Sequence, residues 1–376
     1  MTTPWVRTSA ELAALVDELA DAKAIGLDIE GDSLHHYTEQ TCLIQVSSNR
    51  GGAWLVDPLA GFDLAPLASI MRDPAILKVF HAGDNDVTAM RRDFGFTFRT
   101  LFDTSIAARL LGDTELGLQA IVRNELGIEL TKGSQKDDWS KRPLTPKQEA
   151  YALADVQHLM ELAARFTARL AEAGRTEWAR EEFAALAALA DVPRVDDRTG
   201  PDEFRRIKGS AKLTRRQQAV LRELYAWREE RARLADRPPF KVVAPDVLLA
   251  LAEDSPTNLD DIEDALASFP RQRDQTKIVL AAIQRGLEAP EPEREQRAKA
   301  PSRTAVRLVE KLREWRDGEA KRTGLDPSII LPTKLLERVA SAAPTSLVEL
   351  AAVDGMRRWR VATWGTGVVA ITSTLA

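Results

Sequence analysis

Hydrophobic and polar positions in the first hundred residues alternate with two different periods. Apolar runs with strand-like spacing cover 24–30, 41–48, 53–58 and 77–82. Apolar residues at helical spacing cover 10–20, 64–73 and 87–95. The first three strand-like runs have short connections, as in an antiparallel sheet, whereas the fourth lies between two helices. Strands mixed with crossover helices predict an α/β domain around one sheet.

From about residue 103 onward, the apolar positions follow helical spacing. The predicted helices cover 105–111, 117–126 and 145–174. Thr145 followed by Pro146 is a good start signal for the last of them, because threonine caps free N–H groups and proline fits the first helical position. The α/β domain is therefore expected to end in a series of helices.

Two polar, proline-containing stretches at 191–202 and 287–302 are typical of linkers. The helical segments that follow them look alike, because Trp227 and Trp315, Pro245 and Pro332, and Pro256 and Pro344 stand 88, 87 and 88 residues apart. Such constant offsets predict an internal duplication. The predicted boundaries are 1–190 for the α/β domain, 191–207 for a linker, 208–288 for a first helical domain, 289–302 for a second linker and 303–376 for a divergent second helical domain.

The composition, 44% hydrophobic and 29% charged, is that of a soluble globular protein. Cys42 is the only cysteine, which excludes an internal disulfide and a multi-thiolate zinc site. No apolar run approaches the roughly 18 residues that a membrane span requires. These features predict a cytoplasmic protein that does not contact a membrane.

Charge is unevenly distributed along the chain, whose net charge is −5. Residues 1–190 hold 19 Lys/Arg against 28 Asp/Glu, whereas the remaining residues hold 33 against 29. The segment 205–241 carries 12 basic residues against four acidic ones. An acidic domain joined to a basic segment is compatible with a metal-using nuclease that carries a nucleic-acid-binding module. Ordinary solvated helix faces would give the same pattern.

Asp28 and Glu30 end the first strand-like run, two residues apart. The alternation of side chains along a strand places both on one face. Burying two carboxylates is costly unless a divalent cation, which prefers oxygen ligands, offsets their charge. A lone D-x-E pair is more often a solvent-facing strand end.

Three further polar residues follow in helical segments. Tyr151 and Asp155 share one face of the predicted helix 145–174, one turn apart. Asp86 begins the helix after the strand at 77–82, where an acid could equally cap free N–H groups, and Asp84 competes for the same role. Each feature alone is more often structural, but their order and setting together are more specific.

The segments DIEGDSLHHYTEQTCLIQVSS, FHAGDNDVTAM and DTSIAARLL through ADVQHL resemble ribonuclease D, a family of 3′→5′ exonucleases with four acidic ligands and a tyrosine. The resemblance spans roughly residues 5–185 and implies a ribonuclease H-like mixed sheet with flanking helices. In the family's HAG-x-x-D motif the acid falls on Asp86 and not on Asp84 of this chain, so the resemblance implies Asp86. The catalytic residues that it implies are Asp28, Glu30, Asp86, Tyr151 and Asp155, and the four acids among them are the implied metal ligands.

The repeated helical segments resemble HRDC domains, small all-α nucleic-acid-binding modules also found in RecQ-type helicases. The two resemblances together imply release of 5′-mononucleotides from single-stranded RNA 3′ ends, with precursor tRNA as a substrate. Two divalent cations about 3.5–4 Å apart would serve both sides of an in-line displacement. All-oxygen ligands favour Mg²⁺ or Mn²⁺. Asp28 is expected to bridge the cations and Tyr151 to orient the attacking water. A monomer is expected, because nothing resembles a dimerisation helix.

The candidates for contact with nucleic acid are His81, Lys136, Trp139, Arg215, Arg216, Arg228 and Lys241. Trp139 could stack on a base or pack internally. The basic residues of 205–241 could contact phosphates, with aromatic residues interleaved. Two alternatives stay open: a 3′→5′ exonuclease of the same superfamily that acts on DNA, and a non-catalytic protein that binds nucleic acid through its HRDC-like repeats.

Overall fold

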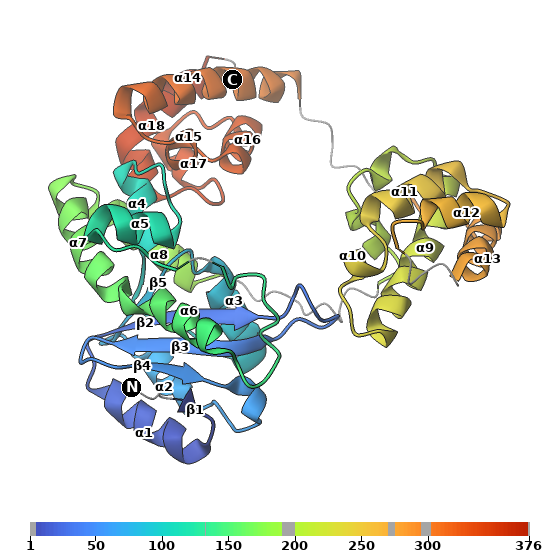
Figure 1. The fold of residues 1–376 in the computed structure, drawn as a ribbon. Helices are drawn as coiled ribbons and strands as arrows, with labels where there is room; N and C mark the ends of the chain where they lie inside the picture. The colour runs from blue at the N-terminus through green and yellow to red at the C-terminus, as the bar shows by residue number, and fades with distance from the viewer. Residues whose placement is uncertain (1–4, 132, 190–199, 270–274, 295–301, 375–376) are drawn as a thin grey trace.

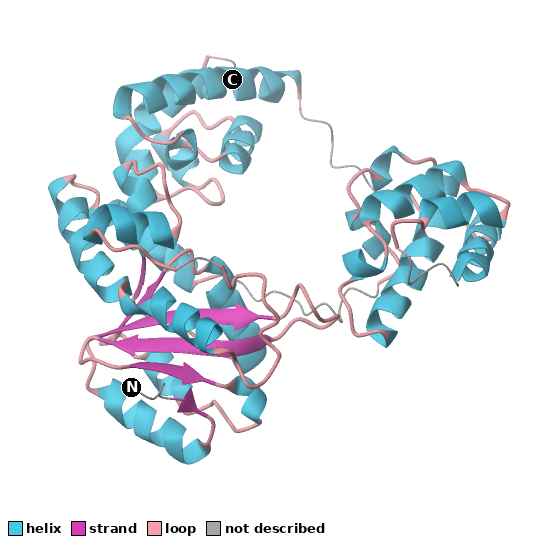
Figure 2. Cartoon of the chain, viewed as in Figure 1, coloured by secondary structure: helices cyan, strands magenta, loops and turns pink. Residues whose placement is uncertain are grey.

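The chain forms an α/β domain and two helical repeats (Figures 1 and 2). The computed structural model describes residues 5–131, 133–189, 200–269, 275–294 and 302–374. The predicted linkers therefore lie partly outside the described residues, over 191–199 and 295–301. Of the helices in these ranges, none is both long and apolar enough to cross a membrane.

A mixed sheet with the strand order β1–β4–β3–β2–β5–β6 forms the centre of the α/β domain. Its strands are β1 (Trp5–Val6), β2 (Ala24–Gly31), β3 (Thr41–Ser48), β4 (Ala53–Val56), β5 (Leu77–Phe80) and β6 (Leu101–Asp103). Strands β2, β3 and β4 are antiparallel, as predicted, whereas β5 is parallel to both β2 and β6. The sequence does not predict β1 and β6, because strands of two or three residues are too short to show alternation.

Helices cover both faces of this sheet. On one face lie α1 (Ser9–Ala20), α2 (Leu67–Arg72) and α3 (Asp84–Phe94). The short 3-10 helix η1 (Pro58–Ala60) follows β4, and its Leu59 packs against the apolar cluster of the opposite face. Across the other lie α6 (Pro146–Gln157) and α7 (Leu159–Glu172), with α4 (Thr104–Leu111) and α5 (Leu118–Leu126) packed on α7, and α8 (Thr176–Ala187) beside β6. Ile25, Leu27, Ile44 and Val46 of β2 and β3 face α1–α3 and are fully buried, so they form the core of this face.

The predicted helix over 145–174 is two helices, α6 and α7, which are separated at His158. The Ser47 hydroxyl on β3 donates to the Val156 carbonyl at 2.8 Å. The His158 N–H bonds the same carbonyl. Because this carbonyl is used outside the α-helical pattern, the chain bends there. The hydrogen bond from Ser47 holds the end of α6 against the sheet.

The two helical repeats have the same order of helices, in agreement with the predicted duplication. The first contains α9 (Arg215–Leu234), α10 (Pro239–Val242), α11 (Pro245–Asp254), α12 (Leu259–Ala265) and α13 (Thr276–Glu288). The second contains α14 (Arg303–Thr323), α15 (Pro327–Ile330), α16 (Thr333–Ala342), α17 (Leu347–Ala351) and α18 (Arg358–Thr372). Ser255 and Ala343 end the third helix of each repeat in the left-handed conformation, with φ of 46° and 45°.

The first repeat begins earlier than predicted. The sequence assigns residues 200–207 to the linker, but Phe204 and Ile207 are buried in the core of this repeat. They lie in or next to the 3-10 helices η3 (Glu203–Arg206) and η4 (Ser210–Lys212). Two apolar residues among charged ones do not alter the polar composition of the segment, which is why it resembles a linker.

The repeats contact the α/β domain at different places. In the second, Trp359 and Trp364 of α18 lie against Trp178 of α8, with ring centroids 4.5 and 5.3 Å from that of Trp178. The first is reached by the β2–β3 loop, residues 32–40, which projects from the sheet toward it (Figure 1). In that loop His36 Nδ1 lies 2.7 Å from Asp236 Oδ2 of the first repeat.

Candidate active site

Strand β2 carries the first two acids of the candidate site. Asp28 and Glu30 pair across the ladder with Gln45 and Leu43 of β3, so all four side chains lie on one face of the sheet. This is the face that α6 covers. The predicted alternation is therefore observed, and both residues are largely buried but keep some exposed surface.

Helix α6 brings Tyr151 and Asp155 over this face. Its start is a capping box formed by Thr145 and Gln148 with Pro146 in the first turn, as the sequence predicts. Its end approaches the sheet closely at Gly26, where a Cβ atom would lie 2.5 Å from Ser47 Oγ and 3.1 Å from the Val156 carbonyl. Glycine at this position therefore allows α6 to descend onto β2.

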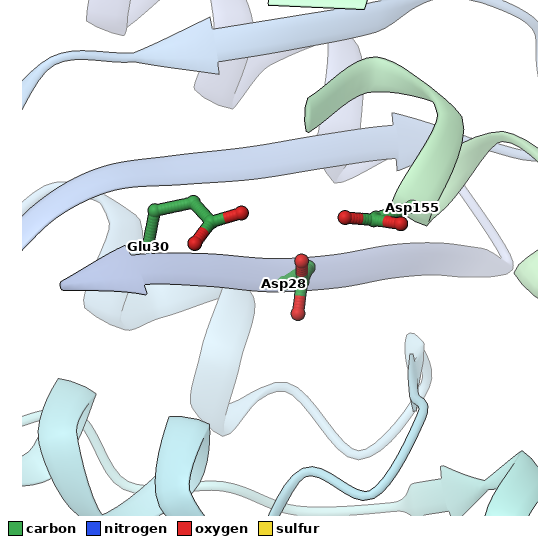
Figure 3. A group of neighbouring side chains, drawn as sticks. All are labelled: Asp28, Glu30 and Asp155. Carbon is green, nitrogen blue, oxygen red and sulfur yellow. The ribbon is translucent and has the colours of Figure 1, made fainter. Parts of the chain in front are cut away.

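Three carboxyl groups converge as a result. Asp28, Glu30 and Asp155 can each offer one oxygen so that all three atoms lie within 4.8 Å of one another. Figure 3 shows the two β2 side chains and the α6 side chain turned toward the same space. Asp86 does not belong to this group of three, but its charge raises the pKa of both Asp28 and Glu30.

The turn between β5 and α3 positions Asp86. Ala82 has a positive φ of 54°, and a Cβ atom on Gly83 would lie 2.6 Å from Phe80 Cβ, so the turn requires a residue without a side chain. The Asp103 carboxylate, fully buried at the end of β6, accepts the Gly83 N–H at 2.8 Å and braces the turn. Sequence reasoning missed Asp103, since only its place at the end of a three-residue strand could have indicated it.

The second candidate in this turn, Asp84, differs from Asp86 in exposure. Asp84 is exposed to solvent, whereas Asp86 is buried in the first turn of α3 and faces the acids of β2. This geometry favours Asp86, the residue that the HAG-x-x-D motif indicates.

All four carboxyl groups hold their protons unusually tightly. Burial, followed by the charges of Asp155 and Asp86, raises the pKa of Glu30 to about 9. Burial also raises the pKa of Asp155 and that of Asp86 to about 7 each. Burial and the other three acids raise the pKa of Asp28 well above its ordinary value. Such a group is unfavourable when ionised unless positive charge is supplied, and its all-oxygen donor set fits divalent cations.

Tyr151 lies beside these acids and donates a hydrogen bond to Asp155, its neighbour one turn later. Burial, followed by the charges of Asp155, Glu30 and Asp28, raises the pKa of the Tyr151 phenol above its ordinary value. The phenol is therefore protonated at neutral pH. It can donate or accept a hydrogen bond but cannot serve as a base.

The Trp139 ring packs against the Tyr151 ring. It is 1% exposed, and its ring centroid lies 6.2 Å from that of Tyr151 within a small apolar cluster. The expectation that Trp139 stacks on a base is therefore not met, because the loop 134–145 folds the indole inward. Of the two alternatives, the packing role describes the residue.

A cleft of about 460 Å³ opens beside the acids. Its lining includes Glu30 and Asp86, together with Arg92, Gln135 and Asp137. Asp137, which sequence reasoning did not single out, is close enough to contribute to the raised pKa of Glu30. The cleft gives a substrate direct access to the carboxyl groups.

Two further predicted contact residues, His81 and Lys136, differ in their exposure to solvent. His81 Nδ1 lies 2.8 Å from Thr104 Oγ1, and burial lowers the pKa of the His81 imidazole to about 4, so this ring is neutral. The Lys136 side chain is exposed, and its carbonyl lies 3.0 Å from His35 Nε2. Contact of either residue with nucleic acid stays a prediction.

Only some of the basic residues predicted to contact phosphates in the first repeat are exposed. Arg228 is buried, pairs with Glu229 at 2.8 Å and lies over the Tyr225 ring, so it does not present its charge to a phosphate. Its place on the inner side of α9 is the physical reason. Arg215 and Arg216 bond carbonyls at or after the end of α13 but stay half-exposed. Lys241 on α10 is half-buried.

Fold and site together define a 3′→5′ exonuclease followed by two HRDC domains. A family model described as "3'-5' exonuclease" matches residues 3–171, and one described as "HRDC domain" matches residues 217–276 and 306–372. The chain is 35% identical to a ribonuclease D of Pseudomonas paraeruginosa, over 95% of this chain and 94% of that one. It is 32% identical to a ribonuclease D of a Jannaschia species, over 89% and 88%. The chain therefore belongs to the ribonuclease D family, and the predicted enzyme class, a hydrolytic 3′→5′ exoribonuclease, is confirmed.

A solved structure has the same fold along the whole chain. The crystal structure of Escherichia coli RNase D, described as an exoribonuclease involved in structured RNA processing, superposes with a TM-score of 0.73 at 24% identity. The match covers 100% of this chain and 99% of that one. The predicted order of an α/β domain and two HRDC-like domains is confirmed. The family implies the use of divalent cations, and the acid cluster is a candidate site for them.

Proposed function

We propose that the α/β domain trims RNA from the 3′ end at the acid cluster, with two Mg²⁺ or Mn²⁺ ions held by Asp28, Glu30, Asp86 and Asp155. The observation that carries this proposal is the convergence of half-buried carboxyl groups whose pKa values are raised by burial and by one another. When bound, the cations would supply charge stabilisation on both sides of the displaced phosphorus. Release of 5′-mononucleotides would follow.

Tyr151 would orient the attacking water. Its hydroxyl reaches Asp155 and holds its proton, so the group acts through hydrogen-bond geometry and not as a base. Trp139 limits the movement of the Tyr151 ring, because the two rings are in contact within a buried cluster. The chain would thus provide the Tyr151 hydroxyl as a hydrogen-bond donor, held in place beside the four carboxylates.

The route of the RNA strand would lead toward the first HRDC domain. A groove of about 470 Å³ between the β2–β3 loop and this domain shares Ser33 and Glu39 with the cleft beside the acids. Arg206 and Lys208 line the groove, so the path leads from the acidic cleft to basic side chains. Single-stranded RNA fits such a path, because its phosphates attract basic side chains and its bases can stack on aromatic ones.

We further propose precursor tRNA as the natural substrate, a monomer as the active form and the cytoplasm as the site of action. Residues 1–190 would form the catalytic unit. Residues 208–288, extended by 200–207, and residues 303–376 would form the two HRDC units.

The central test uses Asp28→Asn, which removes one charge from the acid group without changing its size. We expect hydrolysis of a labelled single-stranded RNA to fall by about 10³-fold, equivalent to several kcal/mol of transition-state stabilisation. Mn²⁺ should raise the melting temperature of the wild type but not that of the variant. The gain for the wild type should increase between about pH 6 and pH 9, because the raised pKa values make cation binding compete with protons.

Asp84→Asn is the matched control, since Asp84 is exposed two residues from Asp86 and should tolerate the change. Mononucleotide release that survives Asp28→Asn would show that the chemistry occurs elsewhere. Faster hydrolysis of a DNA strand of the same sequence would support the DNA alternative instead.

A further inference from the structure

Gln45 occupies an unusual position for an amide side chain. It lies in the middle of β3, where it pairs across the ladder with Asp28 on one side and Leu55 of β4 on the other. It is fully buried. Leu43 and Ser47, two residues to either side, share its face and contact the α6 layer. The Gln45 side chain therefore lies under α6, next to the acid on the neighbouring strand.

Neither polar atom of this amide has a partner among the described residues. Both Gln45 Oε1 and Gln45 Nε2 are inaccessible to solvent and without a hydrogen bond. Leaving a buried donor or acceptor unsatisfied costs about 1–3 kcal/mol each. The other buried glutamine of this domain, Gln148, has its amide engaged with Thr145 in the capping box. The orphaned amide thus stands beside the candidate acid site.

Packing alone does not explain a glutamine here. Leu43, Leu55 and Ala152 form an apolar cluster over the same face. A methionine would occupy a similar volume in this setting without unsatisfied polar atoms, and such volume-conserving changes are well tolerated in cores. The amide is therefore a cost to the protein that the surrounding apolar contacts do not offset.

We infer that Gln45 is a positioning residue of the acid site, whose amide N–H donates to the Asp28 carboxylate once divalent cations are bound there. Side chains directly opposite in an antiparallel pair have Cβ atoms about 4.5–5.5 Å apart, within reach of such a bond. A carboxylate offers about four lone-pair sites, so a cation ligand still has sites for a hydrogen bond. Metal-ligating carboxylates are commonly held in this way, and the partner fixes their orientation. This inference rests on the proposed function.

The test is Gln45→Met in the full chain, with three measurements. In chelator, the melting temperature should equal or exceed that of the wild type, because the unsatisfied amide is gone. The affinity for Mn²⁺, measured by electron paramagnetic resonance, should fall by about 10–100-fold, the usual effect of removing a partner of a metal ligand. On labelled RNA, kcat should fall while KM stays constant, since the residue does not contact the strand.

Gln275→Met is the matched control, because Gln275 is a buried glutamine with an unsatisfied Oε1 at the start of α13 in the first HRDC domain, outside the site. It should leave the Mn²⁺ affinity unchanged. Wild-type Mn²⁺ affinity in Gln45→Met would overturn the inference, as would equal losses of stability with and without cation. If Gln45→Met does not fold, Gln45→Leu gives the same readouts. A wild type that binds no Mn²⁺ would overturn the proposed function, whereas normal binding by both proteins overturns this inference alone.

Discussion

The two HRDC domains have the same helices in the same order but join the nuclease domain by different means. The second places α18 against α8, where Trp359 stacks on Trp178 and one apolar cluster runs through both domains. Buried polar groups reinforce this contact, because Glu182 accepts the Trp359 indole N–H at 3.2 Å and pairs with Arg360 at 2.9 Å. The neighbouring Glu181 caps the start of α18 by accepting the Arg358 backbone N–H at 2.8 Å.

The first HRDC domain meets the nuclease domain through the β2–β3 loop. Asp236, in the turn after α9, accepts the Tyr37 backbone N–H at 3.1 Å and lies 2.7 Å from His36 Nδ1. The Tyr37 ring enters the core of the HRDC domain, and its hydroxyl donates to Glu229 at 3.3 Å. These contacts are mainly polar and local.

The two HRDC domains therefore contact different parts of the nuclease domain. The second domain packs against α8, which itself lies beside β6. The first is attached to the loop that follows β2, the strand of Glu30, and Ser33 and Glu39 of this loop line the cleft beside the acids. The first domain is therefore joined to a loop that lines the cleft beside the acids, whereas the second domain packs against α8.

Trp359→Ala should have the largest effect on the attachment of the second HRDC domain and on the stability of the nuclease domain. Trp359 is 3% exposed and contacts both Trp178 and Trp364, so its removal leaves a large cavity between the domains. We expect the free energy of unfolding of the nuclease domain to fall by about 3–5 kcal/mol. Urea denaturation followed by loss of nuclease activity measures this effect.

Trp227→Ala is the matched variant, because Trp227 is a buried tryptophan of the first HRDC domain, 5% exposed. It should unfold that domain more easily and leave the midpoint of the nuclease transition unchanged. Equal shifts of the nuclease transition in both variants would mean that the two domains are attached equally firmly.

Glu182→Gln should have a smaller effect in the same direction. The change keeps the size of the side chain but leaves the buried Arg360 guanidinium without its anionic partner. Hydrogen bonds to charged groups contribute about 1.5–3 kcal/mol, and a decrease of that size is expected in the stability of the nuclease domain. Glu172→Gln, at an exposed position on α7, is the control. Unchanged stability in Glu182→Gln would show that the tryptophans alone hold the contact.

Much of the fold and of the acid group could be predicted because it depends on local rules. Strand alternation places Asp28 and Glu30 on one face, and helical spacing places Tyr151 one turn from Asp155. Thr145 and Pro146 mark the start of α6 as expected. The constant offset between Trp227 and Trp315 predicts the duplication. These features need only a few neighbouring residues, or a comparison of the chain with itself.

The features that could not be predicted depend on contacts between distant segments. The burial of Trp139 depends on β3, β4 and α6 meeting in space, and that of Arg228 on the side of α9 that faces the core. Phe204 lies in a segment of polar composition but is buried against helices that follow it. The attachment of the second HRDC domain to α8 likewise joins residues about 180 positions apart, which no periodicity reports.

The smallest predicted effect is a pH-dependent weakening of the contact between His36 of the β2–β3 loop and Asp236 of the first HRDC domain. It would distinguish this polar attachment from the apolar attachment of the second HRDC domain. His36 Nε2 lies 2.8 Å from Ser140 Oγ, whose own proton goes to Asp138, and Nδ1 faces Asp236. Both ring nitrogens must therefore donate, which requires the imidazolium form. Burial opposes this form, but the hydrogen bond and charge of Asp236, with Asp32 and Asp138, raise the pKa of His36 above its ordinary 6.5.

Because the folded pKa is raised, the contact is complete below about pH 6.5 and is lost as the pH rises through the higher folded value. Asp236 is largely exposed, so the contact is screened and is worth about 0.2–1 kcal/mol. Energy transfer between labels on α5 and α12 should report a wider distance distribution at pH 8.5 than at pH 6. His36→Gln should give the wide distribution at both pH values, and Trp359→Phe, in the other attachment, should keep the wild-type response. A response to pH that persists in His36→Gln would assign the loosening to another group and leave the loop contact independent of pH.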